Sequence, residues 1–205
     1  QIYYILFNPP PTSIAVEINS FCNRKCRFCP NYKYEREKVF LEENLFYKIV
    51  CDLKNMKFKG EFTFNMFNEP LLDKRLIKFI EYVGKELPSV YIEINTNGDL
   101  LDLSLFKKLK DAGVDFMNVT QYDGKISDSI QNILDNLSLS EKQSLYVHTL
   151  DVICNRAGEV DVESNQKLPL RRFCRRPFYQ LCINYKGKAV LCCNDYFGVV
   201  EKGDL

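Results

Sequence analysis

The chain has 205 residues, of which 46% are hydrophobic and 27% are charged, as expected for a soluble globular protein of one large domain with or without a small appendage. Its 28 Lys and Arg residues against 27 Asp and Glu residues leave a net charge of +1, which gives no general attraction to nucleic acid or to a membrane surface. No apolar run approaches the roughly 18 residues of a membrane span, and the first residues have no signal-peptide pattern, so we expect a cytoplasmic protein. Because it lacks an initiator Met and stops abruptly, we expect a piece of a longer protein.

Stretches with the spacing of strands and of helices alternate up to residue 153. Strands are predicted over residues 14–18, 61–66, 90–96, 116–120 and 144–153, and helices over residues 41–53, 71–87, 101–110 and 126–137. Strands separated by helices indicate parallel βαβ units. Since these strands are too few for a closed eight-stranded barrel, we predict an α/β fold, an open, partial TIM-like βα barrel of about five to six parallel strands with functional residues at their carboxyl ends.

The pattern changes after Ile153. Residues 155–169 are polar and loop-like, and residues 178–183 and 189–191 have the pattern of two short strands joined at 185–187. We therefore expect two regions: the partial barrel over residues 1–154, and a small Cys-rich β-hairpin appendage over residues 155–205 that is incomplete at its C-terminal end.

Nine cysteines raise the choice between a disulfide-stapled domain and a set of metal ligands. The length of the chain, the odd count and the tight spacing of Cys22, Cys26 and Cys29 all favour metal. Three thiolates suit an iron–sulfur cluster or zinc, and the single histidine, His148, argues against mixed Cys/His zinc sites.

The cysteine loop directly follows the first predicted strand. A CxxxCxxC loop in this position resembles the radical S-adenosylmethionine (SAM) superfamily. The resemblance implies that Cys22, Cys26 and Cys29 hold a [4Fe–4S] cluster whose open iron binds SAM, and that cleavage of SAM gives a 5′-deoxyadenosyl radical. It also implies that Phe28 packs on the adenine of SAM. The alternative for these cysteines is a zinc knuckle.

Loops after later strands extend the resemblance. Met66 to Pro70 is similar to a Gly-Gly-Glu-Pro loop that holds the amino group of SAM, with Phe67 and Asn68 in place of the glycines. Residues 95–98 are similar to a Thr-Asn-Gly segment near the ribose and the carboxylate. The alternative is ordinary turn chemistry. The resemblance predicts that these residues bind the cofactor: Asn68, Glu69, Asn95, Asn97, Thr120 and Gln121.

The tail resembles the SPASM and shorter "twitch" appendages, which bind auxiliary [4Fe–4S] clusters. Cys174 and Cys192 match the first two ligands. The remaining ligands would lie beyond residue 205, or Cys182 or Cys193 would substitute for them, or the cluster is absent. Two structural thiols are the alternative reading of Cys174 and Cys192.

Ahead of the appendage, residues 155–158 read Asn-Arg-Ala-Gly, a segment found in several SPASM and twitch enzymes. The resemblance implies that Arg156 contacts the substrate, because an arginine at comparable spacing does so in a twitch-type aminocyclitol dehydrogenase. A turn arginine with a solvated head is the alternative.

Three classes of function follow. The first is a radical dehydrogenase or epimerase acting on a small polar substrate such as a sugar, an aminocyclitol or a nucleotide-linked sugar; in an epimerase Cys154 or Cys182 would return the hydrogen. The second is a maturase that modifies a ribosomally made peptide. The third is a non-catalytic iron–sulfur electron-transfer protein. For the first two we expect an external one-electron reductant of the flavodoxin or ferredoxin type, and for none a membrane or nucleic acid partner.

Overall fold

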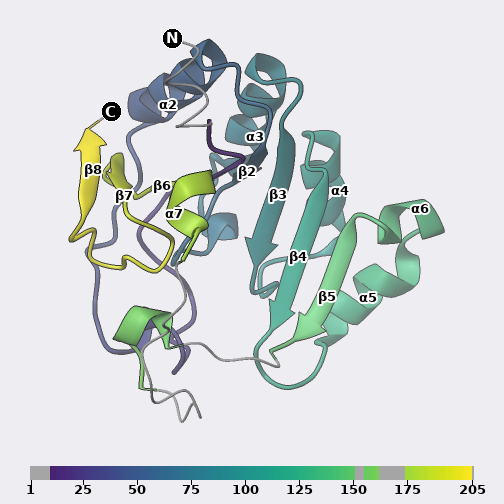
Figure 1. The fold of residues 1–205 in the computed structure, drawn as a ribbon. Helices are drawn as coiled ribbons and strands as arrows, with labels where there is room; N and C mark the ends of the chain where they lie inside the picture. Colours follow the sequence, from purple (N-terminus) through teal and green to yellow (C-terminus); the bar gives the residue numbers. More distant parts are fainter. Residues whose placement is uncertain (1–9, 151–154, 162–173, 205) are drawn as a thin grey trace.

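The computed structural model describes residues 10–150, 155–161 and 174–204. These residues form one eight-stranded sheet with the strand order β5-β4-β3-β2-β1-β6-β7-β8 (Figure 1). The six strands from β5 to β6 run parallel, whereas β7 is antiparallel to both of its neighbours, β6 and β8. The predicted α/β partial barrel with a C-terminal hairpin is therefore confirmed.

The strands are β1 (Ser13–Val16), β2 (Glu61–Thr63), β3 (Tyr91–Thr96), β4 (Phe116–Gln121), β5 (Leu145–Thr149), β6 (Gln180–Ile183), β7 (Lys188–Val190) and β8 (Glu201–Asp204). The α-helices are α2 (Glu43–Asn55), α3 (Leu76–Glu86), α4 (Leu103–Asp111), α5 (Asp128–Asn136), α6 (Leu139–Lys142) and α7 (Arg176–Tyr179), with single turns of 3-10 helix η1 (Pro30–Tyr32), η2 (Pro70–Leu72) and η3 (Arg156–Gly158). Among the described residues no helix is long and apolar enough to cross a membrane.

One face of the sheet is covered by helices α2 to α5 (Figure 1). Each of α2 and α3 buries an apolar stripe three and four residues apart, which is the period of an amphipathic helix. The stripes meet where the rings of Phe46 and Phe79 stack with centroids 4.0 Å apart. The strands contribute alternate side chains to this core, among them Ile14, Phe62 and Ile94.

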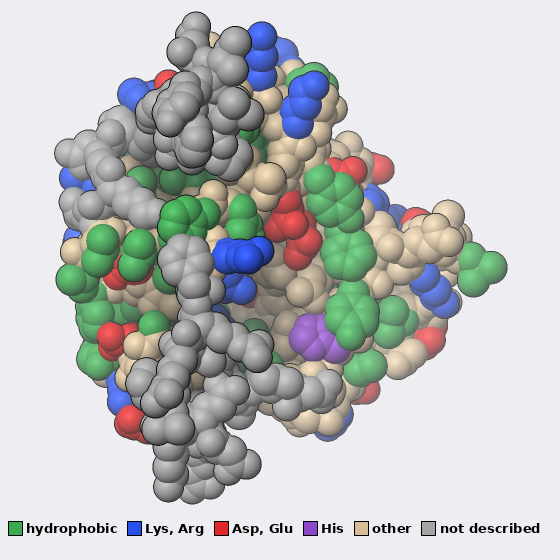
Figure 2. Space-filling model, viewed as in Figure 1, with side chains coloured by type: hydrophobic (Ala, Val, Ile, Leu, Met, Phe, Trp, Pro, Cys, Tyr) green, Lys and Arg blue, Asp and Glu red, His purple; other side chains and the backbone are tan. Residues whose placement is uncertain are grey.

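The other face of the sheet is polar, because the intervening strand positions point away from the helices. Figure 2, drawn from this side, shows acidic side chains gathered near the middle of the face beside a group of hydrophobic ones. The hydrophobic core lies on the helix-covered face, so the polar residues on the inward side of the partial barrel are not part of it. We therefore expect a functional site on this inward face.

Three predicted elements differ from the structure. Strand β2 ends at Thr63 rather than at residue 66, because the chain turns between Phe64 and Asn68. The helix predicted over 71–87 divides into η2 and α3, where Asp73 accepts from the backbone N–H of Arg75 at 2.9 Å. Residues 178–179 were expected to begin a strand but close the short helix α7, whose first turn contains Pro177.

Strand β6 belongs to the main sheet. It pairs in parallel with β1, with Ala15 opposite Cys182, and also forms the predicted hairpin with β7. The sheet therefore runs without interruption across the expected boundary at residues 154 and 155. The division into two regions stays a prediction about function. In the fold, the tail joins the sheet through the pairing of β6 with β1.

Candidate active site

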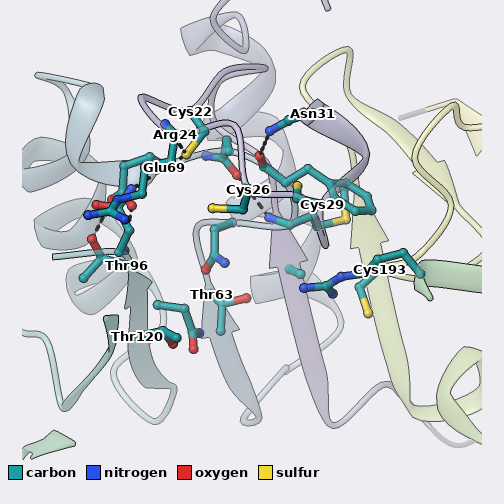
Figure 3. A pocket seen from close by; sticks show the side chains of 18 of the residues that line it. Cys22, Arg24, Cys26, Cys29, Asn31, Thr63, Glu69, Thr96, Thr120 and Cys193 are labelled. Carbon is teal, nitrogen blue, oxygen red and sulfur yellow. Dashed lines mark hydrogen bonds between the residues drawn. The ribbon is translucent and has the colours of Figure 1, made fainter. Parts of the chain in front are cut away.

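A cavity of about 350 Å³ opens on the polar face at the carboxyl ends of the parallel strands. It is lined by the loop after β1, by the loops after β2 and β3, and by inward side chains of the sheet. Figure 3 shows the thiols of Cys22, Cys26 and Cys29 at one end of it, with Thr63 and Thr120 at the other. A volume of this size is in the range of small-molecule sites, roughly 300–1,000 Å³.

The three cysteines of the loop after β1 are all partly buried and line the cavity together. Burial raises the pKa of each thiol, and together with the neighbouring thiols it raises the pKa of Cys26 to about 11. Such thiols become ligands when a metal replaces their protons. Among the described residues no three His, Cys, Asp or Glu side chains are placed to hold a single metal ion. Thiols spread around one cavity suit a cluster of several irons, in which each thiolate binds a different iron.

Arg24, between the first two cysteines, fastens the loop to two other strand ends. Its guanidinium donates to Asp99, which follows β3, at 2.6 Å and 2.5 Å, and to both carboxylate oxygens of Asp123, which follows β4, at 2.9 Å. Both pairs are bidentate, which is the strongest geometry between Arg and a carboxylate. The cysteine loop is thus tied to the ends of β3 and β4 as well as to β1.

Glu69 is buried at the edge of the cavity, with 2% of its surface exposed. Its carboxylate accepts from the Thr96 hydroxyl at 2.7 Å and from the backbone N–H groups of Leu71 and Asn97 at 3.1 Å and 2.9 Å. Burial raises the pKa of this carboxyl, and these donors partly oppose that change. Since a carboxylate offers roughly four acceptor positions, about one is left for a donor in the cavity.

The turn after β3 connects Glu69 to the cysteine loop. The Asn97 side chain donates to Asn23 at 2.8 Å and to the Cys22 sulfur at 3.7 Å. Gly98 follows with φ +77°, and a Cβ atom at this position would lie 2.7 Å from Val119. The turn therefore requires glycine for both its conformation and its space.

The loop after β2 reaches the cavity without the two glycines of the related motif. The Asn68 side chain accepts from the backbone N–H of Met66 at 3.0 Å and donates to the carbonyl of Phe64 at 3.2 Å, which closes the turn. The Phe67 ring is 4% exposed and packs edge-on against Tyr196, with centroids 5.0 Å apart. Asn68 lines the cavity while stabilising its own loop.

Two aromatic side chains form a wall beside the thiols. Phe28 and Tyr122 both line the cavity, and their ring centroids lie 5.2 Å apart. An aromatic wall of this kind is a surface on which a nucleobase can stack.

Arg156 lines the cavity from η3. Both Arg156 and Ala157 have left-handed backbone, with φ of +48° and +59°. Each such residue costs about 1–3 kcal/mol unless its surroundings stabilise it, and such strain is concentrated at functional sites. The Nε atom of Arg156 is buried without a partner among the described residues. Its predicted contact with substrate stays a prediction. The structure places Arg156 in the lining of the same cavity as the three thiols.

The predicted strand-end residues do not all reach the cavity. Asn95 and Thr120 line it, and the Thr120 hydroxyl lies 3.0 Å from His148 Nε2. Gln121 is 4% exposed and is not among the lining residues. Its amide donates to the carbonyl of Asn97 and accepts from the backbone N–H of Ser127, each at 2.8 Å, so it braces two turns.

The tail cysteines occupy different surroundings. Cys193 lines the cavity and accepts from Arg176 at 2.9 Å. Cys182 is fully buried beside Ala15 and Val190 and is not among the lining residues.

The two cysteines matched to auxiliary-cluster ligands lie outside the cavity lining. Cys192 is partly buried and Cys174 is exposed, so the structure does not bring them into the cavity. Cys154 lies outside the described residues.

Arg36, which forms a buried ion pair with Glu17, and Tyr196 connect the tail to the cysteine loop. Arg36 donates to Glu17 at 2.7 Å and to the carbonyl of Tyr196 at 2.6 Å, with its guanidinium 3.9 Å from the centre of the Tyr196 ring. The Tyr196 hydroxyl donates to the side chain of Asn31, two residues after Cys29, at 2.9 Å. These bonds hold the segment after Cys193 against the loop of the three cysteines.

The sequence did not point to Arg24 or to four polar residues that line the cavity from β2, the turn after it and β6: Glu61, Thr63, Asn65 and Gln180. A signal was present for three of them, because Glu61, Thr63 and Asn65 alternate with buried phenylalanines, and alternation marks a strand whose second face is not core.

Comparison with known proteins agrees with this geometry. The model of the radical SAM superfamily matches residues 16–125. Over 199 residues the chain is 30% identical to the S-adenosyl-L-methionine-dependent 2-deoxy-scyllo-inosamine dehydrogenase of Niallia circulans, an alignment that covers 94% of this chain and 77% of that protein.

Two solved structures are similar over most of the chain. The crystal structure of BtrN in complex with AdoMet and 2-DOIA superposes with a TM-score of 0.87 at 27% identity, covering 96% of this chain and 79% of that one. The structure of BtrN in an open conformation has a TM-score of 0.73 at 24% identity, covering 95% and 75%, and shares the fold.

Proposed function

Because the chain belongs to the radical SAM superfamily, we propose that it is a dehydrogenase that oxidises a secondary alcohol of an aminocyclitol such as 2-deoxy-scyllo-inosamine. The observation that carries the proposal is one cavity that combines three cluster-type thiols with buried polar atoms that have no partner in the part of the chain the structure describes. The thiols suit a radical-generating cofactor, and the polar atoms suit a small substrate with many polar groups.

Members of this superfamily bind a [4Fe–4S] cluster and SAM, and we assign Cys22, Cys26 and Cys29 as the cluster ligands. When bound, this cofactor pair supplies the 5′-deoxyadenosyl radical that takes a hydrogen atom from the substrate. The protein residues around it bind and orient. The free acceptor position of Glu69 is offered to the ammonium group of SAM, and the wall of Phe28 and Tyr122 to its adenine.

We assign to Arg156, which lines this cavity, the role of holding the substrate hydroxyl at the carbon that loses hydrogen. Oxidation to a ketone requires that carbon to lose one further electron and the hydroxyl to lose its proton. The positive charge of Arg156 favours loss of that proton, and its Nε, which has no partner among the described residues, is available to the oxygen. Thr120 and Asn95 line the same part of the cavity and would orient the other hydroxyls.

For the electron we propose an auxiliary [4Fe–4S] cluster in the tail, with Cys174 and Cys192 among its ligands. Its support is the likeness to the dehydrogenase of Niallia circulans together with the Glu17–Arg36–Tyr196 contacts, which hold the tail beside the cysteine loop. An external one-electron reductant of the flavodoxin or ferredoxin type would start each turnover.

The test is anaerobic reconstitution followed by assay with SAM, dithionite and 2-deoxy-scyllo-inosamine. The expected result is one ketone for each 5′-deoxyadenosine formed, with about eight irons bound for two clusters and about four for one. Absence of 5′-deoxyadenosine would overturn the radical chemistry. Release of 5′-deoxyadenosine without ketone would overturn the dehydrogenase, and solvent deuterium in a recovered alcohol would assign an epimerase instead.

A further inference from the structure

The carboxylate of Glu61 lines the cavity, and the carboxylate of Glu93 lies beside it on the polar face of the sheet. Glu61 on β2 and Glu93 on β3 are two residues apart in the strand register, since Glu61 is opposite Tyr91 and Thr63 is opposite Glu93, so both point to the polar face. Neither forms an ion pair in the part of the chain that the structure describes. Figure 2 shows acidic side chains gathered on this face. Burial and the charge of Glu61 both raise the pKa of the Glu93 carboxyl, as expected for two facing acids.

Three amide oxygens on the same face lack a donor among the described residues. Asn118 donates to the Asn95 side-chain oxygen at 2.9 Å, and the Asn95 side chain bonds to Glu93, so this chain of bonds starts from a carboxylate and fixes the direction of each amide. Within residues 10–150, 155–161 and 174–204, it leaves the Asn118 side-chain oxygen buried without a partner. The side-chain oxygens of Asn65 and Gln180, both cavity residues, are buried and unpartnered in the same way.

These acceptors indicate which chemical group of a substrate would bind to them. Two carboxylates and three amide oxygens are all acceptors. A hydroxyl brings one hydrogen and an oxygen that needs a donor, whereas a protonated amine brings three hydrogens, a positive charge and no acceptor. Buried acceptors without donors cost free energy, and so does an uncompensated pair of carboxylates. An ammonium group neutralises the pair of carboxylates and donates hydrogen bonds to them, whereas a hydroxyl brings no charge.

We propose that Glu61 and Glu93 hold the ammonium group of the substrate. The assignment rests on the proposed function and states how that cavity selects an amino sugar or aminocyclitol over a purely hydroxylated ring. Glu61 lies two residues, or about 7 Å, before Thr63 at the carboxyl end of β2. The amine therefore sits on the part of the ring away from Cys22, Cys26 and Cys29, and the oxidised carbon on the part nearest them.

The test measures binding without turnover. Equilibrium dialysis on the reconstituted, SAM-loaded protein, without reductant, compares 2-deoxy-scyllo-inosamine with the analogue that carries a hydroxyl in place of the amine. We expect the protein to prefer the amine and Glu93→Gln to weaken amine binding by about 10- to 100-fold, the effect of losing one charged hydrogen-bond partner. Affinity for the hydroxyl analogue should change by less than about threefold. Glu61→Gln, on another strand, should behave in the same way, and Glu93→Asp should keep the preference.

Glu81→Gln, on an exposed position of α3, is the matched control and should leave both affinities unchanged. Equal binding of the two probes, no binding of the amine, or an equal loss for both probes in Glu93→Gln and Glu61→Gln would overturn the assignment. Selective binding of the amine with no ketone formed in the assay would overturn the proposed dehydrogenase and leave the amine subsite standing.

Discussion

Two parts of the cavity are built in opposite ways. At the cysteine end the protein supplies its own partners: Glu69 accepts three hydrogen bonds, Arg24 forms two bidentate pairs and Asn97 bonds back to the loop. Elsewhere in the cavity, polar atoms of Asn65 and Gln180 are buried and find no partner among the residues that the structure describes. The first part is organised before any ligand arrives, and the second is completed by the ligand. A site that must hold a reactive cofactor and discriminate among substrates needs both.

The largest effect should come from removing a cluster ligand at the organised end. Cys26→Ala is expected to abolish SAM cleavage, because two thiolates cannot retain the cluster that three hold. The readout is 5′-deoxyadenosine formed with dithionite, alongside the iron content. Cys51→Ala is the control, since Cys51 is exposed on α2 and should retain full activity. Retained cleavage in Cys26→Ala would contradict the assignment of the ligands.

The next largest effect is expected from a substitution that impairs the reaction of the substrate but not the cleavage of SAM. Arg156→Gln is expected to lower ketone formation by about 100-fold, the scale of losing a well-placed substrate contact, while SAM cleavage continues. Measuring ketone and 5′-deoxyadenosine in the same reaction tests this. A parallel fall in both products would place Arg156 at the cofactor end instead.

A smaller loss is expected when the bracing of the cysteine loop is weakened. Arg24→Gln removes the pairs with Asp99 and Asp123 but no ligand, so the iron content should persist while the rate of SAM cleavage falls by about tenfold. Lys48→Gln, which removes an exposed pair with Asp52 on α2, is the matched control and should have no effect. An unchanged rate in Arg24→Gln would show that the loop does not depend on this clamp.

The smallest effect concerns stability alone. Gly98→Ala places a Cβ 2.7 Å from Val119 in left-handed backbone and should lower the free energy of unfolding by about 1–3 kcal/mol. Gly84→Ala, in α3 with nothing within 4 Å of the new Cβ, should raise it by about 0.5–1 kcal/mol. Denaturant unfolding of the apo protein compares the two. Equal effects would mean that the turn after β3 is looser than its contacts indicate.

The sequence was most informative where the chemistry is local. The spacing of Cys22, Cys26 and Cys29 predicts a shared site without knowledge of the fold, and the order of strands and helices predicts the parallel sheet. Glu69 and Asn97 follow successive strands, so their meeting at one edge could also be expected. The structure places all five residues around one cavity.

The parts that sequence reasoning missed depend on contacts between distant segments. Gln121 and Cys182 are residue types that often occur in functional sites. However, both ends of the Gln121 amide form hydrogen bonds with the backbone of turns, and Cys182 packs against Ala15 on β1. Conversely, Arg24 pairs with carboxylates 75 and 99 residues away, which no local pattern reveals. Phe178 lies in a region with a strand-like pattern, yet Pro177 favours the first turn of a helix.

The pairing of β6 with β1 has a consequence for how the protein is made. β1 lies between β2 and β6, and its partner on the second side is Gln180–Ile183, which follows β2 by more than a hundred residues. At a synthesis rate of about 5–20 residues per second, that edge of β1 waits on the order of ten seconds for its partner to leave the ribosome. An apolar strand edge open for that time is a target for chaperones and for pairing with other nascent chains. The yield of folded protein should therefore depend on the tail well before any cofactor is inserted.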